Sequence, residues 1–306
     1  MNVQKLDWLG WSILLLLGTL WGGSFFFAKV ALAEISPTTL VFLRVGIAAV
    51  GMWGYLLITK QTIPLSAKWI GSFLLLGFVN NVVPFSLIFW GQQYIAAGLA
   101  SVLNAFTPIF TMLVMQVLSN EEKLTPTKLV AAMIGIVGVA IMVGSDALSG
   151  ASGQVLPQLA VLGAALCYAF GALVIMRLRK LSPAALATGQ LTASTILLAP
   201  AVLYSAPAEQ LMQASAMTWA SVLILALACT GFAFILYIKL FKLAGATNAA
   251  SVTLVIPVSA ILLGAIFLNE RLEPNPWIGM AAIFTALLLI DGRLTRRLTG
   301  KAQAPA

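Results

Sequence analysis

The chain has 306 residues, of which 61% are hydrophobic and only 8% are charged, whereas an ordinary soluble domain is about 25% charged. Its 17 Lys and Arg and 9 Asp and Glu are too few to cover the surface of a soluble protein of this length. The sequence contains no histidine, which is the commonest general base and transition-metal ligand. Composition therefore argues for an integral membrane protein and against metal or triad enzymes, and we expect no cofactor.

Apolar segments of the length that a transmembrane helix needs, roughly 20 residues, recur along the whole chain. Five are expected in the first half, near residues 8–29, 38–58, 69–91, 97–118 and 126–144. Five more follow, near residues 156–177, 183–204, 218–241, 248–268 and 276–292. Four starts pair a capping residue with a proline, which the first helical turn tolerates: Ser36-Pro37, Thr125-Pro126, Ser182-Pro183 and Asn275-Pro276. The pattern predicts an all-α integral membrane protein with ten transmembrane helices.

The basic residues predict the orientation of these helices, because cytoplasmic loops are enriched in Lys and Arg. With a cytoplasmic N-terminus, fourteen of the 17 cations fall on the cytoplasmic side: Lys5, Lys60, Lys68, Lys123, Lys128, Arg177, Arg179, Lys180, Lys239, Lys242, Arg293, Arg296, Arg297 and Lys301. Only Lys29 and Arg271 fall outside, and Arg44 lies within the second segment. We therefore expect both termini in the cytoplasm, and the net charge of +8 needs no nucleic-acid partner to explain it.

The polar, Gly- and Ser-rich residues 145–154 divide the ten segments five and five. This division predicts one five-helix repeat over residues 1–145 and a second over residues 155–300. Short patterns recur between the halves: Ser36-Pro37 as Ser182-Pro183 after 146 positions, and both Pro108 as Pro257 and Asn120-Glu121 as Asn269-Glu270 after 149 positions. Because five is odd, the second repeat is expected to be inverted in the membrane. Inverted repeats are typical of secondary transporters, which hold their substrate near the middle of the membrane.

The same residues resemble a known family. In the first half they are Trp21-Gly22-Gly23-Ser24-Phe25-Phe26, Lys29, Ser36-Pro37, Arg44, Pro108 and Asn120-Glu121-Glu122-Lys123-Leu124, and in the second half Pro257 and Asn269-Glu270-Arg271-Leu272. This set resembles the EamA unit of the drug/metabolite transporter superfamily. The second half departs from it, with Cys167-Tyr168 in place of Trp21-Gly22 and Gln190 in place of Arg44. The resemblance implies a ten-helix carrier of small metabolites in a bacterial inner membrane, similar to the amino-acid exporters of the YddG type.

Polar and aromatic side chains inside the segments are the candidates for a substrate site, because a polar group in hydrocarbon is costly unless it has a partner or faces water. In the fourth segment Asn104 and Thr107 share a broad helical face beside Pro108. In the eighth, Thr230, Phe234 and Tyr237 follow the spacing of one helical face. Hydrogen bonding between helices and aromatic packing are the alternative interpretations.

Two further pairs complete the predicted site. Asn80 and Asn81 precede Pro84, which frees a backbone carbonyl and interrupts the helix, although the asparagines could also only seal the kink. Trp21 and Tyr168 lie at similar depth in the first segment of each half, where they could stack on a ring or a cation. The alternative for Trp21 is close packing beside Gly18-x-x-x-Gly22. The predicted substrate-binding residues are thus Trp21, Asn80, Asn81, Asn104, Thr107, Tyr168, Thr230, Phe234 and Tyr237.

Charged residues within the segments constrain the substrate. Arg44 lies about six residues, roughly 9 Å, into its segment, so it either extends outward to Glu34 or stays inside as a functional charge, and we favour a structural role. All 9 carboxylates fall in loops or at segment ends. This distribution favours movement down a gradient over strict proton antiport, and neutral or zwitterionic cargo over strongly cationic drugs.

The sequence therefore predicts an inner-membrane secondary transporter that exports amino acids or similar small metabolites by alternating access. Export follows from the family resemblance alone. Efflux of drugs or other hydrophobic compounds is the main alternative, and a channel is another. An enzyme is not expected, because the segments hold neither histidine nor carboxylates. The expected partners are a small-molecule substrate and the lipid bilayer, and the oligomeric state is left open.

Overall fold

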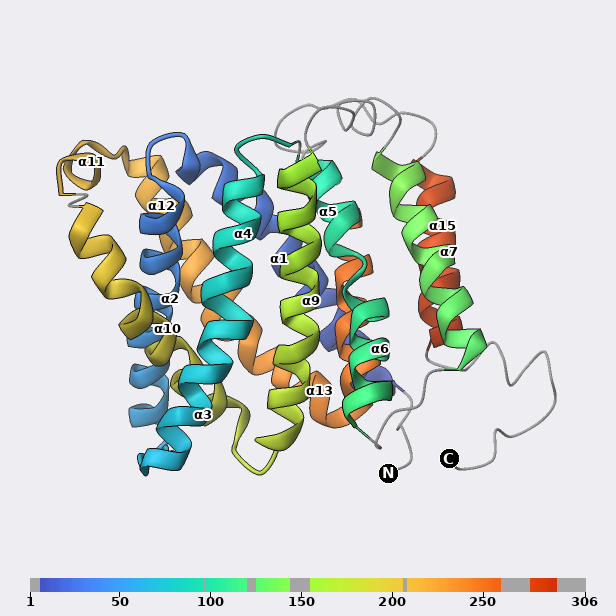
Figure 1. Cartoon of the computed structure of the whole chain (residues 1–306), viewed down its shortest axis with the longest axis horizontal. Helices are drawn as coiled ribbons and strands as arrows, with labels where there is room; N and C mark the ends of the chain where they lie inside the picture. The colour runs from blue at the N-terminus through green and yellow to red at the C-terminus, as the bar shows by residue number, and fades with distance from the viewer. Residues whose placement is uncertain are drawn as a thin grey trace.

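The computed structural model describes residues 6–95, 97–119, 125–143, 155–205, 208–259 and 276–290, and within these ranges the chain is helical apart from short connections and turns (Figure 1). The helices of the first half are α1 (Trp8–Leu32), α2 (Pro37–Ile58), α3 (Ala67–Gly77), η1 (Phe78–Val82), α4 (Val83–Gly91), α5 (Ala97–Asn104), α6 (Thr107–Leu118) and α7 (Pro126–Val143). Those of the second half are α9 (Val155–Arg177), α10 (Pro183–Ser205), α11 (Ala208–Gln213), α12 (Ala216–Ala226), η3 (Leu227–Phe232), α13 (Ala233–Ala250), η4 (Ser251–Leu254) and α15 (Pro276–Ile290).

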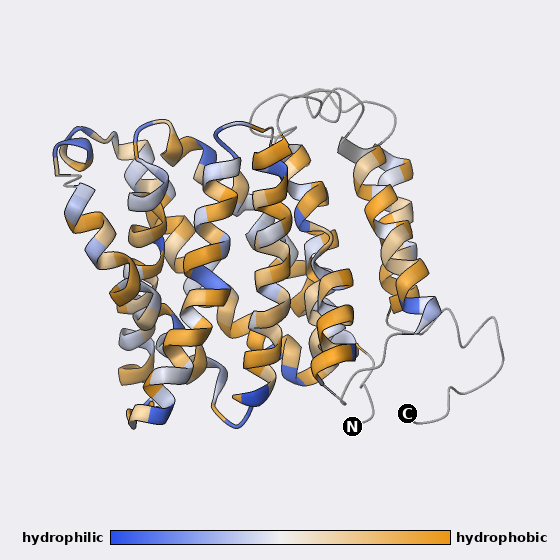
Figure 2. Cartoon of the chain, in the orientation of Figure 1, coloured by the Kyte–Doolittle hydropathy of each residue, from blue (hydrophilic) through white to orange (hydrophobic). Residues whose placement is uncertain are grey.

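Seven stretches of the described chain are long and apolar enough to cross a membrane. Figure 2 shows hydrophobic residues along their length and hydrophilic residues mostly at their ends and connections. The last stretch, Ala216–Ser259, has 44 residues, about twice what one crossing needs. It bends sharply at Gly245, whose φ of 85° suits glycine best, and runs back past α6 (Figure 1). Two shorter apolar helices, α7 and α15, pack against each other at one edge of the bundle (Figure 1).

Four interruptions break the helices near their middle, and they occur in two pairs. The π-helical turn η1 precedes α4 and the π-helical turn η3 precedes α13, in corresponding helices of the two halves. The second pair consists of the break between α5 and α6, which separates Asn104 from Thr107, and of the 3₁₀ turn η4, which precedes Pro257. The predicted interruption at Pro84 is thus present, and a further one lies beside Pro108. At η1 the amide of Val83 bonds the carbonyl of Phe78, five residues back, where a proline at position 84 leaves a carbonyl without its usual donor.

Helix starts follow the predicted capping chemistry in part. The hydroxyl of Thr125 accepts the amide of Lys128, and that of Ser182 accepts the amide of Ala185. At Ser36-Pro37 the predicted helix start is confirmed, with Ser36 at the N-cap and Pro37 at the first position of α2, but the hydroxyl of Ser36 lies 2.9 Å from that of Thr39 and accepts no backbone amide. Asn275 lies outside the described residues, as do Asn120-Glu121 and Asn269-Glu270.

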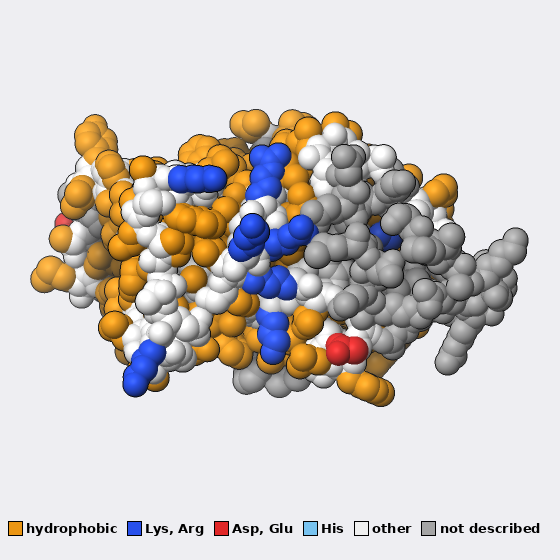
Figure 3. All heavy atoms as spheres, turned by 90° about the horizontal axis from the view of Figure 1, so that it is seen from below, with side chains coloured by type: hydrophobic (Ala, Val, Ile, Leu, Met, Phe, Trp, Pro, Cys, Tyr) orange, Lys and Arg blue, Asp and Glu red, His pale blue; other side chains and the backbone are white. Residues whose placement is uncertain are grey.

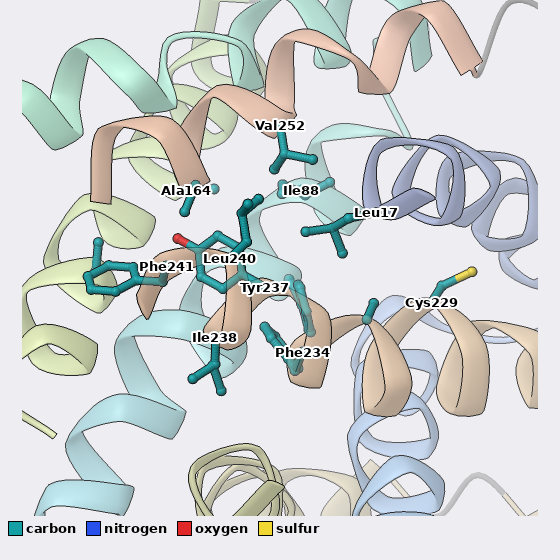
Figure 4. Packing of buried hydrophobic residues seen from close by; sticks show 14 of the residues in the cluster. Leu17, Ile88, Ala164, Cys229, Phe234, Tyr237, Ile238, Leu240, Phe241 and Val252 are labelled. Carbon is teal, nitrogen blue, oxygen red and sulfur yellow. The ribbon is translucent and has the colours of Figure 1, made fainter. Parts of the chain in front are cut away.

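The small residues of α1 form a close helix contact. A Cβ added at Gly18 would lie 2.5 Å from Val255, and one added at Gly22 would lie 1.8 Å from the hydroxyl oxygen of Ser259. That hydroxyl donates to the carbonyl of Gly18 at 2.8 Å. The segment after Gly245 therefore packs directly on α1, and Figure 4 shows Leu17 of α1 and Val252 of this segment in one buried cluster with Tyr237 of α13.

Positive charge gathers at one end of the bundle. The α2–α3 and α9–α10 connections lie at the bottom of Figure 1, where α1 also begins. Seen from this side, Lys and Arg side chains spread across the face (Figure 3). The described basic residues of these connections and the adjoining helix ends are Lys60, Lys68, Arg177, Arg179 and Lys180. Glu34, in the α1–α2 connection, and Glu209, in the first turn of α11, lie at the opposite end.

Candidate functional site

A cavity lies between the two halves of the chain, and about 70 Å³ of it is open to the centre of a water molecule. Helices of both halves line it near their middle, including α1 and α2, the interrupted α3–η1–α4 and α5–α6 helices, α9, and α13 with η4. Its lining residues are Trp21, Ser24, Phe25, Arg44, Asn80, Phe85, Ile88, Phe89, Gln92, Asn104, Thr107, Tyr168, Phe234, Tyr237, Ala250, Val252, Thr253 and Ile256. A mostly apolar space with a few polar groups is typical of a small-molecule site.

Aromatic rings line this cavity in two groups. The ring centroid of Trp21 lies 5.4 Å from that of Tyr237 and 6.4 Å from that of Phe234 in an edge-to-face arrangement. Figure 4 shows Phe234 and Tyr237 on adjacent turns of α13. Phe85 and Phe89 stack on the neighbouring helix with centroids 6.4 Å apart. We call these five residues the aromatic wall; they offer both flat faces and positive ring edges to a bound molecule.

Arg44 is the charged residue among the described side chains that line the cavity. It is buried, at 4% exposure. Its Nε donates to the hydroxyl of Thr230 at 2.7 Å, and its Nη2 donates to the carbonyl of Cys229 at 3.5 Å. Its guanidinium carbon lies 3.9 Å from the ring centroid of Phe85, a close cation–π contact. Of the two alternatives for Arg44, the outward contact with Glu34 is not made, and the carboxylate of Glu34 accepts the amide of Ser215.

The neutral polar residues of the cavity are partly paired. The amide nitrogen of Asn80 donates to Gln190 at 3.1 Å, and the hydroxyl of Thr107 donates to the carbonyl of Asn104 at 2.6 Å. The side-chain oxygens of Asn104 and Gln92 are buried and accept no hydrogen bond from any described residue. Such acceptors are costly to leave unpaired, so they are candidates for contact with a bound polar group.

The sequence pattern of the EamA-like transporter family matches residues 8–144 and again residues 156–291. The chain belongs to the EamA-like transporter family. Each match covers one half, so the protein has the two-repeat architecture of the family and is a member of the drug/metabolite transporter superfamily.

Similar proteins agree with this assignment. The chain is 24% identical over 283 residues to the uncharacterized transporter YoaV of Bacillus subtilis (strain 168), covering 91% of this chain and 95% of YoaV. It is 25% identical over 279 residues to the uncharacterized inner membrane transporter YedA of Escherichia coli (strain K12), covering 89% and 87% of the two chains. A solved structure, titled only as the crystal structure of a protein, shares the fold with a TM-score of 0.76, 18% identity, and 95% and 97% coverage. The EamA-family protein is therefore a multi-pass inner-membrane transporter, and the family indicates a transporter rather than an enzyme.

Most of the predicted site residues meet at the cavity of this transporter. Those that line it are Trp21, Asn80, Asn104, Thr107, Tyr168, Phe234 and Tyr237. Asn81 and Thr230 are not among the lining residues. Asn81 donates to Ser194 of α10 at 2.9 Å and so joins two helices, while Thr230 accepts from Arg44. For these two residues the structure shows the alternative role of helix contact.

The cavity also includes residues that were not predicted, and the internal repeat identifies several of them. Pairs of lining residues lie 149 positions apart: Phe85 and Phe234, Ile88 and Tyr237, Asn104 and Thr253, and Thr107 and Ile256. This is the offset that relates Pro108 to Pro257. Applying it to the predicted Phe234, Tyr237 and Asn104 yields Phe85, Ile88 and Thr253, so the signal was present in the sequence. The inward position of Arg44 had no such signal, because residue 190 is a glutamine.

Proposed function

We propose that this EamA-family protein is a secondary transporter that exports amino acids or similar small neutral or zwitterionic metabolites by alternating access. The cavity between the two repeats carries the proposal, since aromatic, amide and guanidinium groups converge there near the middle of the helices. A site at the interface of two repeats can open alternately to either side when the repeats move against each other.

The proposal includes ten membrane passes with both termini in the cytoplasm. Seven apolar stretches, the reversal at Gly245 in the last of them, and the shorter helices α7 and α15 support this count. The basic face at which α1 begins supports the orientation. Pairs of interrupted helices at the cavity supply flexible points for the movement.

We further propose that transport follows the gradient of the substrate. The described carboxylates, Asp7, Glu34 and Glu209, all lie at helix ends or in connections and away from the cavity lining. Proton-coupled carriers normally place an acidic residue or histidine within the membrane. Export is the direction implied by the resemblance to amino-acid exporters.

The aromatic wall also favours a second candidate, efflux of drugs or other hydrophobic compounds. The two candidates differ in the polar head group that the site accepts. An amino acid needs polar contacts at both its ammonium and its carboxylate, whereas a hydrophobic drug needs mainly apolar contact with the aromatic wall.

Reconstituted protein tests the proposal. Proteoliposomes loaded with labelled aromatic, aliphatic and polar amino acids are expected to release at least one class with saturable kinetics and with competition among members of the class. Protein-free vesicles are the control. Flux that rises linearly with concentration would indicate a channel, release of hydrophobic dyes alone would favour drug efflux, and no movement of any class would refute the proposal.

A further inference from the structure

A buried cation in a membrane protein requires an explanation, because removing a guanidinium from water is costly without a partner. The structure gives Arg44 two neutral acceptors and an aromatic ring. Among the described residues no carboxylate forms an ion pair with it. These contacts hold the side chain in place, but none of them neutralises its charge.

The second repeat shows that the structural part of this role needs no charge. Arg44 of α2 links its helix to η3, and Gln190 of α10, 146 positions later, links its helix to η1 through Asn80. The two links connect corresponding elements of the opposite halves. A neutral amide therefore suffices to join these helices, so helix packing does not account for the positive charge at position 44.

One nitrogen of the Arg44 guanidinium, Nη1, is available to a ligand. Nε and Nη2 are used, whereas Nη1 donates to no described residue, and Arg44 lines the cavity. The plane of the guanidinium is fixed by its contacts with the ring of Phe85 and with the hydroxyl of Thr230. A planar guanidinium with a fixed orientation suits a carboxylate, to which it donates charge-assisted hydrogen bonds.

We propose that Arg44 binds the carboxylate of the transported molecule, and that the substrates are monocarboxylates whose apolar part rests on the aromatic wall. This inference rests on the proposed transport function and specifies the substrate class. A single carboxylate balances the single cation that the described lining provides, whereas a phosphate or a dicarboxylate would bring excess negative charge. A monocarboxylate with an apolar side chain meets both requirements, and in an amino acid the additional ammonium can donate to the unpaired buried oxygens of Asn104 and Gln92.

Ligand binding to the purified protein tests the inference without requiring transport. Thermal unfolding is measured with phenylalanine, 3-phenylpropionate, phenylalaninamide and phenethylamine, because a ligand that binds the folded state raises the midpoint. The first two carry a carboxylate and are expected to stabilise the protein. The amide and the amine keep the ring but lack the carboxylate, and are expected to bind about tenfold to a hundredfold more weakly. Equal stabilisation by all four, or by none, would overturn the inference.

Variants locate the effect at Arg44. Arg44→Gln places at position 44 the neutral residue that the second repeat uses, and is expected to remove the preference for carboxylates. Arg44→Lys keeps the charge and should retain the preference with weaker binding, which answers the objection that Arg44→Gln is simply misfolded. Lys180→Gln removes an exposed cation far from the cavity and should bind like the wild type. An unchanged preference in a folded Arg44→Gln protein would contradict the inference.

Transport by the same proteins separates this inference from the proposed function. Carboxylate-selective binding that depends on Arg44, with no movement in proteoliposomes, would refute transport and leave the binding site standing. Saturable transport that the amide and the amine inhibit as well as phenylalanine does would support transport and refute the role of Arg44.

Discussion

Trp21 lies at the cavity beside a close helix contact of α1. Its indole ring contacts Tyr237 and Phe234 at the cavity, while Gly18 and Gly22 beside it pack on the segment that contains Val255 and Ser259. The close packing that the sequence allowed here is therefore present, and stacking of Trp21 on a substrate stays a prediction. The glycines bring the backbone close, and the ring projects into the space that remains.

Replacing Trp21 by alanine is expected to reduce transport efficiency by about tenfold or more, because the substrate loses a large apolar contact surface. Initial rates in proteoliposomes over a range of substrate concentrations measure the effect. Trp8→Ala is the matched control, since Trp8 is 90% exposed at the start of the same helix. Equal rates in the two variants would assign Trp21 to packing alone.

Thr230 is a positioning residue for Arg44. Its hydroxyl accepts from Nε of Arg44 and donates to the carbonyl of Leu225, both at 2.7 Å. In Thr230→Val the guanidinium loses its fixed acceptor, and we expect discrimination between phenylalanine and phenylalaninamide to fall about tenfold. Thr230→Ser keeps the hydroxyl and should restore the discrimination. Loss of stability with unchanged discrimination would show a purely structural role.

Glu34 makes the α1–α2 connection sensitive to acid. The backbone amide of Ser215 donates to its carboxylate at 2.7 Å, which lowers the pKa of Glu34 below its ordinary value of 4.5. A lowered pKa in the folded state means that the contact stabilises the protein fully above about pH 4.5 and less as the pH falls through the folded value. Thermal unfolding between pH 7 and pH 4 should therefore show a steeper acid loss in wild type than in Glu34→Gln. Identical pH profiles would show that the contact contributes nothing.

At the scale of the helices, the paired interruptions determine which side chains reach the cavity. Proline marks three of them: Pro84 follows η1, Pro108 lies in the first turn of α6, and Pro257 follows η4. These positions could be predicted from the sequence. The turn η3 contains no proline, and there the hydroxyl of Thr230 bonds a carbonyl five residues earlier. Local sequence did not indicate that turn, because no proline marks it.

The contact between α1 and the segment after Gly245 offers a test of helix packing. Gly22→Ala would place a Cβ 1.8 Å from Ser259 and 2.8 Å from the carbonyl of Ile256, so the helices must separate. We expect a destabilisation of about 1–3 kcal/mol, measured by thermal or denaturant unfolding in detergent. Gly54→Ala is the control, because an added Cβ there has no atom within 4 Å, and alanine favours the helix. If both variants were equally stable, the close contact would not exist in the folded protein.

At the scale of the whole molecule, the internal repeat explains why much of the cavity could be predicted and part of it could not. Residues on equivalent faces of the two halves, such as Phe85 and Phe234, follow from one offset. Asn80 and Asn81 are adjacent and chemically identical, yet one lines the cavity and the other faces Ser194. Hydropathy and spacing cannot separate such neighbours, because the direction of each side chain depends on the extra residue that the π-helical turn inserts.

The orientation of the whole bundle leads to a labelling experiment. Cys167 and Cys229 are first replaced by alanine, and single cysteines are then introduced in Lys180→Cys, within the α9–α10 connection, and in Gln213→Cys, at the end of α11. Both positions are exposed and lie at opposite ends of the bundle (Figure 1). If the basic face is cytoplasmic, a membrane-impermeant maleimide should label Gln213→Cys in intact cells and Lys180→Cys only after permeabilisation. The reverse pattern would invert the topology and with it the proposed direction of export, whereas labelling of both in intact cells would exclude a membrane barrier between the two faces.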